Sequence, residues 1–144
     1  MSHSFGYIMI PFMTLCWVLA WQTCLVEYKR KMAGVQYPQM YAEKAEADNS
    51  KTAYVFNCAN RAHQNTLEVL PVILMSTIIM GIDHPVVAAM LCEIFALSRV
   101  FYTLGYMKEP LKRVRGARVS SLATLGLLLG ATKTSLNFVL NIVV

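Results

Sequence analysis

The chain has 144 residues, of which 56% are hydrophobic and only 15% are charged. A soluble domain carries about 25% charged residues, so this composition argues against an ordinary cytosolic enzyme, a disordered regulator and a nucleic-acid-binding protein. The length favours one compact unit, a single domain over residues 1–144, and the mean hydropathy of +0.47 indicates a membrane protein.

The first predicted span is an uncharged, mostly apolar stretch at residues 4–26, which ends before the first charged residue, Glu27. A transmembrane helix needs roughly 20 such residues. A secretory signal peptide is the competing interpretation. A signal peptide has a charged region before its apolar run, whereas here Lys29, Arg30 and Lys31 follow the run. The order of charges therefore indicates a helix that is retained.

Three weaker spans follow the first one. Residues 69–82 are free of charge but few, so this helix should begin upstream and contain Arg61 and Glu68. The other two spans are predicted at residues 85–106 and 119–144. Their interiors are apolar apart from three charged residues, namely Glu93, Arg99 and Lys133. The pattern predicts an all-α protein, an integral membrane four-helix bundle.

The connections and the charges predict how the bundle is oriented. Gly and Pro break the helix at residues 81–85, and the longest connection, 33–55, is polar. A third connection, residues 108–116, is predicted to be a basic loop that leads into the fourth span. Of the 13 Lys and Arg residues, six lie within 29–61, six within 99–118, and the last is Lys133. The positive-inside rule places both basic segments in the cytosol and both termini on the other side. Topology therefore explains the net charge of +5, and no nucleic-acid partner is expected.

Cysteine and histidine give no sign of a metal site. The four cysteines, at positions 16, 24, 58 and 92, form no Cys-x-x-Cys pair, and no histidine lies near them at the spacing of zinc ligands. We interpret the cysteines as small buried apolar residues. His3, His63 and His84 are too scattered for a metal site.

Two stripes of polar side chains lie toward the predicted cytosolic ends of the second and third spans. Residues spaced 0, +4 and +7, as in the first stripe, fall within about 60° of one another on a helix, and the spacing 0, +3 and +7 of the second again forms one stripe. Charges inside a membrane usually face a protein interior or a wet cavity. The two stripes combine arginine, glutamate, amide and phenol side chains, and this combination suits a small zwitterionic ligand with excess negative charge. Arginine binds carboxylates, glutamate binds an ammonium, and amide and phenol groups bind peptide groups. The stripes are Arg61, Asn65 and Glu68, followed by Arg99, Tyr102 and Tyr106.

Structural interpretations of the same residues remain open. Arg61 and Glu68 could pair with each other or with neighbouring chains, only to hold a bundle together. The tyrosines could belong to an interfacial aromatic belt, and Arg113 could be a topology anchor. The Gly126–Gly130 pair in the last span is consistent with close helix packing.

The residues also resemble a known family. Residues 56–69, FNCANRAHQNTLEV, resemble the second-span signature of the membrane-associated proteins in eicosanoid and glutathione metabolism (MAPEG). Within that family they are most similar to the microsomal glutathione S-transferases of the third type. Further similar pieces occur in the same order along nearly the whole chain. They are Tyr37-Pro38-Gln39-Met40-Tyr41, His84-Pro85, Gly105-Tyr106, Glu109-Pro110 and Lys112-Arg113-Val114-Arg115-Gly116.

The resemblance implies a homotrimer in the endoplasmic reticulum membrane, or in the outer mitochondrial or another microsomal membrane. Glutathione would be the co-substrate, bound between subunits near the cytosolic face, and no metal is expected. Arg113 matches the residue credited with activating the thiol, and Arg115 is a second candidate. His63 and Arg30 match positions that reach a neighbouring subunit's glutathione, and His63 lies about 160° from Arg61 on the helix. The remaining glutathione positions match Arg61, Asn65, Glu68, Tyr102 and Tyr106, with Arg99 beside them.

The implied activity is transfer of glutathione to lipophilic electrophiles and glutathione-dependent reduction of lipid hydroperoxides, both reaching the site from membrane lipid. Val69 and His63 depart from the leukotriene-forming branch of the family, which has tyrosine and glutamine there, so leukotriene epoxides are one substrate class among several. The alternatives are a non-catalytic scaffold of the same fold that presents lipid to a partner enzyme, and a small multidrug-type transporter. The transporter would leave the tyrosine stripe and the basic segment near Arg113 unexplained.

Overall fold

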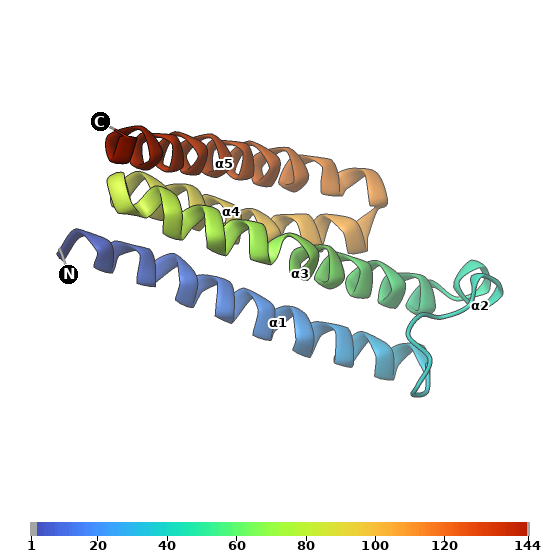
Figure 1. Cartoon of the computed structure of the whole chain (residues 1–144). Helices are drawn as coiled ribbons and strands as arrows, with labels where there is room; N and C mark the ends of the chain where they lie inside the picture. Colours follow the sequence, from blue (N-terminus) through green and yellow to red (C-terminus); the bar gives the residue numbers. More distant parts are fainter. Residues whose placement is uncertain (1–2, 144) are drawn as a thin grey trace.

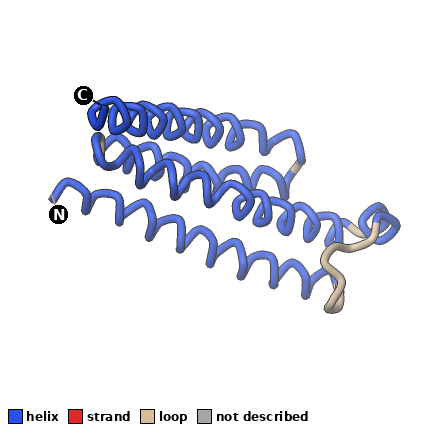
Figure 2. The backbone as a smooth tube through the Cα atoms, viewed as in Figure 1, coloured by secondary structure: helices blue, strands red, loops and turns tan. Residues whose placement is uncertain are grey.

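The computed structural model describes residues 3–143, which fold into long antiparallel helices (Figure 1) joined by short loops (Figure 2). In chain order the elements are η1 (His3–Ile8), α1 (Met9–Ala33), α2 (Lys44–Asn49), α3 (Lys51–Asp83), α4 (Pro85–Lys108), η2 (Pro110–Lys112) and α5 (Arg113–Val143).

The predicted four-helix membrane bundle is confirmed. Within the described residues, four helical segments are long and apolar enough to cross a membrane: Gly6–Ala33, Lys51–Asp83, Pro85–Lys108 and Pro110–Leu140. Helices α3 and α4 form the centre of the bundle and contact each other, while α1 and α5 each pack against both of them. In Figure 1, α1 and α5 accordingly lie on opposite sides of the central pair.

The helices begin and end where local signals require it, and three predicted boundaries need correction. α1 continues through Lys31 to Ala33 and ends at Gly34, whose φ of 70° is left-handed. α3 begins at residue 51, and Ser50 caps this end, because its side chain accepts a hydrogen bond from the backbone N–H of Ala53. The second correction is therefore that the predicted connection 33–55 ends at Ser50 and contains the short helix α2.

The third correction concerns the basic segment 108–116, which we expected to be a loop. Only Glu109 separates α4 from η2, and α5 already begins at Arg113, so most of the basic side chains are on helices. Since this segment is helical, Arg113 has a fixed direction relative to α4. Val144, the last residue of the predicted fourth span, lies outside the described residues.

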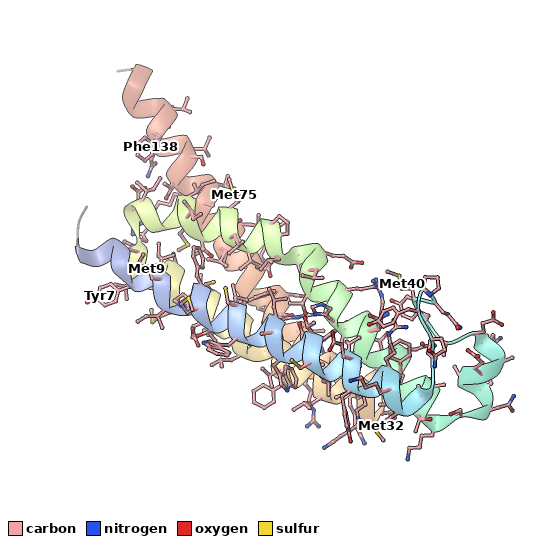
Figure 3. The ribbon with its side chains drawn as sticks, turned by 90° about the horizontal axis from the view of Figure 1, so that it is seen from below. Tyr7, Met9, Met32, Met40, Met75 and Phe138 are labelled. Atoms are coloured by element: carbon pink, nitrogen blue, oxygen red, sulfur yellow. The ribbon has the colours of Figure 1, made fainter. Side chains whose placement is uncertain are left out.

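The basic segments share one end of the bundle, as their distribution predicts. α1 and α4 end there and α3 and α5 begin there, while both termini and the turn at His84 lie at the other end (Figure 1). We call the first of these the basic end. Apolar side chains project outward along the bundle, among them Tyr7, Met9, Met75 and Phe138 far from the basic end (Figure 3), as expected for helices facing lipid.

Small residues bring α5 close to the two central helices. A Cβ on Gly116 would lie 2.5 Å from the backbone nitrogen of Tyr102 on α4. The Gly126–Gly130 pair packs as predicted, with Gly126 against Leu91 of α4 and Gly130 against Met80 of α3. The helices therefore approach closely next to the polar stripes, and the apolar core lies beyond them, around Leu15, Ile73, Phe95 and Leu127.

Candidate functional site

A cavity of about 600 Å³ lies between α3, α4 and α5, on the side of the bundle away from α1. Three of its lining residues are arginines, one from each helix, and apolar side chains line the remainder together with hydroxyl groups of α5. The lining residues are Arg61, Asn65, Val69, Phe95, Arg99, Tyr102, Arg113, Ala117, Ser120, Ser121, Thr124, Leu125 and Leu128.

The stripe on α3 is arranged as helix periodicity predicts. Arg61 Nη1 lies 2.7 Å from Glu68 Oε1, and Asn65 Nδ2 donates to Glu68 Oε2 at 3.2 Å. Glu68 lies beside the cavity but does not line it. The pairing of Arg61 with Glu68, one of the open alternatives, therefore occurs within this chain. Their side chains are nevertheless 45% and 53% exposed, although both lie inside a membrane-spanning segment.

Arg99 is the most deeply buried cation of the site, with only 2% of its surface exposed. Its Nε donates to Thr66 Oγ1 and its Nη2 donates to Asn65 Oδ1, both at 3.0 Å. The guanidinium also lies 3.9 Å from the centre of the Tyr102 ring. Among the side chains of residues 6–140, no carboxylate lies within 4.0 Å of Arg99. All its contacts are thus neutral, and its positive charge is not compensated within this part of the chain.

Arg113 enters the cavity from the first turn of α5. Its guanidinium lies 4.5 Å from the centre of the Tyr106 ring, which meets the Tyr102 ring edge-on at 5.8 Å. Tyr106 itself does not line the cavity; it contacts Arg113 instead. Gly105 makes room for this arrangement, because a Cβ there would lie 2.8 Å from the carbonyl oxygen of Lys112.

Arg113 and Arg115 are distinguished by this geometry. Arg113 is half-buried and lines the cavity, whereas Arg115 is exposed and is not among the lining residues. Sequence spacing left both arginines open for a role next to a thiol. Of the two, only Arg113 lines the cavity, and its role next to a thiol stays a prediction.

His63 lies on a different face of α3 from Arg61, as the helical arithmetic predicts. It is half-buried, and its Nδ1 lies 3.4 Å from Gln22 Oε1 on α1. His63 therefore does not line the cavity of its own chain. A contact with the ligand of a neighbouring subunit stays a prediction.

Arg30 is also separate from the cavity. Its Nη1 donates to the carbonyl oxygen of Gln39 at 2.5 Å and its Nη2 to that of Met40 at 3.3 Å. The guanidinium lies between two aromatic rings, 4.4 Å from Tyr37 and 4.7 Å from Phe56. In this chain Arg30 holds the segment 34–43 against α1 and α3. Its role toward a neighbouring subunit stays a prediction.

Further contacts tie the same segment to α3. Asn57 exchanges hydrogen bonds with the backbone of Ala42 at 2.8 and 2.9 Å, and the Tyr41 hydroxyl donates to Gln64 Oε1. Burial raises the pKa of Tyr41 above its ordinary value of 10.0, so at neutral pH the phenol keeps the proton that this bond requires. The segment 34–43, which we call the covering segment, is thus held in place by contacts that do not involve the cavity.

Sequence reasoning missed several polar residues that line the cavity or lie behind its lining. Gln22 was counted within the apolar first span, although a lone amide in such a helix is a signal for hydrogen bonding between helices. Thr66 and Thr103, which contact it, lie five and four residues after candidate site residues. The hydroxyl groups of α5 share a helical face, and this periodicity could have identified them: Ser120, Ser121 and Thr124.

The interpretation of the cysteines was half correct. Cys58 and Cys92 are buried, but Cys16 and Cys24 are exposed on the outer side of α1. A side chain on a lipid-facing helix need not be buried in protein to be in an apolar environment, which explains the error. The described residues contain no group of three or more His, Cys, Asp or Glu side chains that could hold a metal ion.

Comparison with known protein families agrees with the bundle. The model of one family, the MAPEG family, matches residues 8–133, which include the second and third of the long helical segments whole and most of the first and the fourth. The match contains the α3 stripe, the α4 stripe and Arg113. The chain belongs to the MAPEG family.

Proposed function

We propose that this chain is a membrane-bound glutathione transferase that also reduces lipid hydroperoxides with glutathione. Family membership supports a glutathione- or eicosanoid-related function in a membrane. The observation that carries the more specific proposal is Arg99: a buried guanidinium that lines a cavity and has no carboxylate within reach in the described part of the chain.

The argument is electrostatic. A buried charge without a counter-charge costs several kcal/mol, and this cost is greatest where no water is available. A ligand carboxylate next to Arg99 would remove that cost, and two further guanidinium groups, of Arg61 and Arg113, line the same cavity. The site thus has an excess of positive charge, while Glu68 beside it offers one carboxylate for an ammonium. Glutathione, with its carboxylates, ammonium and thiol, has this pattern of charges.

In the proposed complex the carboxylates of glutathione bind Arg99 and Arg61, and its ammonium binds Glu68. Asn65 and the phenol of Tyr102 provide partners for its peptide groups from the cavity wall, and the phenol of Tyr106, which does not line the cavity, provides one from beside Arg113. The thiol lies next to Arg113. The assignments on α3 and α4 follow from charge and hydrogen-bonding capacity and use every polar stripe residue that sequence analysis singled out there, whereas the assignment of the thiol to Arg113 rests on the family resemblance.

The proposed chemistry begins with the thiolate. A free thiol has a pKa near ~8.5, so about a few per cent is ionised at neutral pH, and the thiolate is the nucleophile. A guanidinium next to the sulfur stabilises the negative charge. Lowering the thiol pKa by two units would need about 2.7 kcal/mol, which one charge-assisted hydrogen bond in a partly dry site supplies.

Two reactions follow from the same thiolate. On an epoxide, sulfur attacks carbon, the C–S bond forms, the C–O bond breaks, and the alkoxide takes a proton from water. On a hydroperoxide, sulfur attacks the terminal oxygen and the O–O bond breaks, so the lipid leaves as an alcohol after protonation. The first glutathione now carries that oxygen as a sulfenic acid. A second glutathione condenses with it, giving glutathione disulfide and water. Apolar lining residues, among them Val69, Leu125 and Leu128, suit a lipophilic substrate that enters from the bilayer.

A homotrimer in the endoplasmic reticulum membrane is part of the proposal. The exposure of Arg61 and Glu68 inside a span supports a covering partner, since lipid-facing charges are costly. The predicted roles of His63 and Arg30 toward a neighbouring subunit would require such contacts. Chemical cross-linking and native mass measurement in detergent test the assembly.

The test of the chemistry is an ultraviolet difference titration of the purified protein with glutathione. We expect a saturable thiolate band in the native protein and in Arg115→Ala, and no band in Arg113→Ala. A band that survives in Arg113→Ala but not in Arg115→Ala would reassign the activating residue. The absence of binding and of any band in the native protein would overturn the transferase proposal in favour of the non-catalytic scaffold.

A further inference from the structure

A buried amide lies next to the cavity, on a helix that contributes nothing to its lining. Gln22 of α1 is completely buried, although it lies in the middle of a membrane-spanning segment. Its Nε2 lies 3.0 Å from Thr66 Oγ1 on α3 and 2.8 Å from Thr103 Oγ1 on α4. Gln22 therefore joins α1 to both central helices.

The direction of each of these hydrogen bonds is fixed by the threonine protons. Thr66 donates its hydroxyl proton to the carbonyl oxygen of Ala62 at 3.0 Å, and Thr103 donates its own to that of Arg99 at 2.8 Å. Each hydroxyl has only one proton, so both oxygens must accept from Gln22 Nε2. The amide can have only one orientation, with both N–H groups used. Its Oε1 is then left facing His63 Nδ1.

The same threonine oxygen holds Arg99. Thr66 Oγ1 accepts a second hydrogen bond, from Arg99 Nε at 3.0 Å, so its one proton and both of its acceptor positions are occupied. Asn65 Oδ1 accepts from Arg99 Nη2. The guanidinium is thereby held at two points behind the cavity, and the remaining N–H groups on its terminal nitrogens are not used by these contacts.

We propose that Gln22 is a positioning residue for the ligand site: through the Thr66 hydroxyl it fixes the rotation of the Arg99 side chain, so that the unused N–H groups of Arg99 face a bound carboxylate. This proposal rests on the proposed function for the identity of the ligand. It adds a residue of α1, outside the lining of the cavity, to the machinery that recognises the ligand.

A purely structural role is the competing explanation, because amides also hold membrane helices together. The two roles differ in what they couple. A helix-joining amide contributes to stability whatever residue occupies position 99. A positioning amide contributes to glutathione binding only while position 99 has a guanidinium with an Nε–H group.

The first test uses matched variants and calorimetric titration with glutathione. Gln22→Met, close in volume but without the amide, should weaken binding about tenfold, because Thr66 Oγ1, which accepts from the charged Arg99 Nε, loses the amide hydrogen bond that fixes it. Thr66→Val should weaken binding to the same degree, whereas Thr66→Ser keeps the hydroxyl and should bind as the native protein does. Thr23→Val, at an exposed position next to Gln22, is the control and should have no effect.

A double-mutant cycle separates positioning from stability. Arg99→Lys removes the Nε–H group and should itself weaken binding. In the Arg99→Lys background, Gln22→Met should then cause less than a twofold further loss, because the interaction it supported no longer exists. A full tenfold loss in both backgrounds would overturn the proposal and make Gln22 a structural residue.

A second measurement does not depend on glutathione. In protein labelled with ¹⁵N-arginine, the Nε–H signal that disappears in Arg99→Lys belongs to Arg99. We expect slow hydrogen exchange of this signal in the native protein and in Thr23→Val, and fast exchange in Gln22→Met. Unchanged exchange in Gln22→Met would overturn the positioning role. Native protein that binds no glutathione, but keeps this exchange pattern, would instead overturn only the proposed function.

Discussion

Two buried arginines of this protein have opposite surroundings. Arg30 and Arg99 are 9% and 2% exposed. Arg30 donates to two backbone carbonyl oxygens and lies between two aromatic rings, so the covering segment 34–43 occupies it on several sides. Arg99 contacts one hydroxyl, one amide and aromatic rings, and it lines a cavity. Burial alone therefore does not distinguish the two arginines; the difference lies in their partners and in the cavity next to Arg99, and our proposal places the ligand there for this reason.

The largest expected effect comes from Arg99→Met. Since a carboxylate of glutathione would lose its buried partner, we expect binding to weaken at least about 100-fold, or about 3 kcal/mol. Thermal stability of the unliganded protein should stay equal or rise, because an uncompensated buried charge is removed. Calorimetry and thermal unfolding in detergent measure the two quantities. A large loss of stability together with intact binding would contradict the ligand-binding role of Arg99 and make it a residue that stabilises the fold, as we expect of Arg30.

The same substitution at the other arginine should have the opposite result. Arg30→Met leaves the carbonyl groups of Gln39 and Met40 without their donors, so we expect unfolding to become easier by about 2 kcal/mol. Limited proteolysis should cut the segment 34–43 faster than in the native protein. Glutathione binding should fall much less than in Arg99→Met. Loss of binding without loss of stability would instead favour the role that the family resemblance implies for Arg30.

The position of Arg113 can be tested through Gly116. A Cβ at this position would meet the backbone of Tyr102 at 2.5 Å, which cannot move aside, so Gly116→Ala should displace the start of α5. We expect the thiolate band to weaken about tenfold, the effect of a misplaced charged partner. Gly126→Ala is the control, since its Cβ would meet only the Leu91 side chain, at 3.1 Å. Equal effects of the two substitutions would show that helix packing as a whole is being measured.

The smallest expected effect concerns Tyr41, in the segment that Arg30 holds. Its pKa is raised by burial, so the folded state favours the neutral phenol, and the stability from this preference is complete below the unfolded pKa. That stability should be lost as the pH rises past 10.0 and through the folded pKa. Tyr41→Phe should lack this additional decline in unfolding measurements, and equal pH dependence of the two proteins would contradict the assignment.

Much of the fold could be predicted from the sequence because hydrophobic segments long enough to span a membrane are a strong signal. The charge distribution predicted that the two basic segments share one end. Capping was harder to predict. Ser50 starts α3 well before its apolar part, and the segment around Arg113 is helical because Glu109 alone interrupts the helical path.

The site was predictable where it follows one helix and less so where it crosses between helices. The Arg61–Glu68 contact follows from a spacing of seven residues on α3. The bond from Gln22 to Thr103 joins residues 81 positions apart, and no local pattern specifies it. Likewise, nothing near Arg30 in the sequence shows that backbone carbonyls of the following segment fold back onto it.

The most direct test of the central claim compares two ligands on the native protein. Calorimetric titration with glutathione and with its dimethyl ester changes only the carboxylates, so no variant has to fold. If Arg99 and its neighbouring arginines hold carboxylates in the cavity, glutathione should bind and the diester should bind at least about 100-fold more weakly. Equal affinities for the two ligands, or no binding of glutathione, would contradict the account.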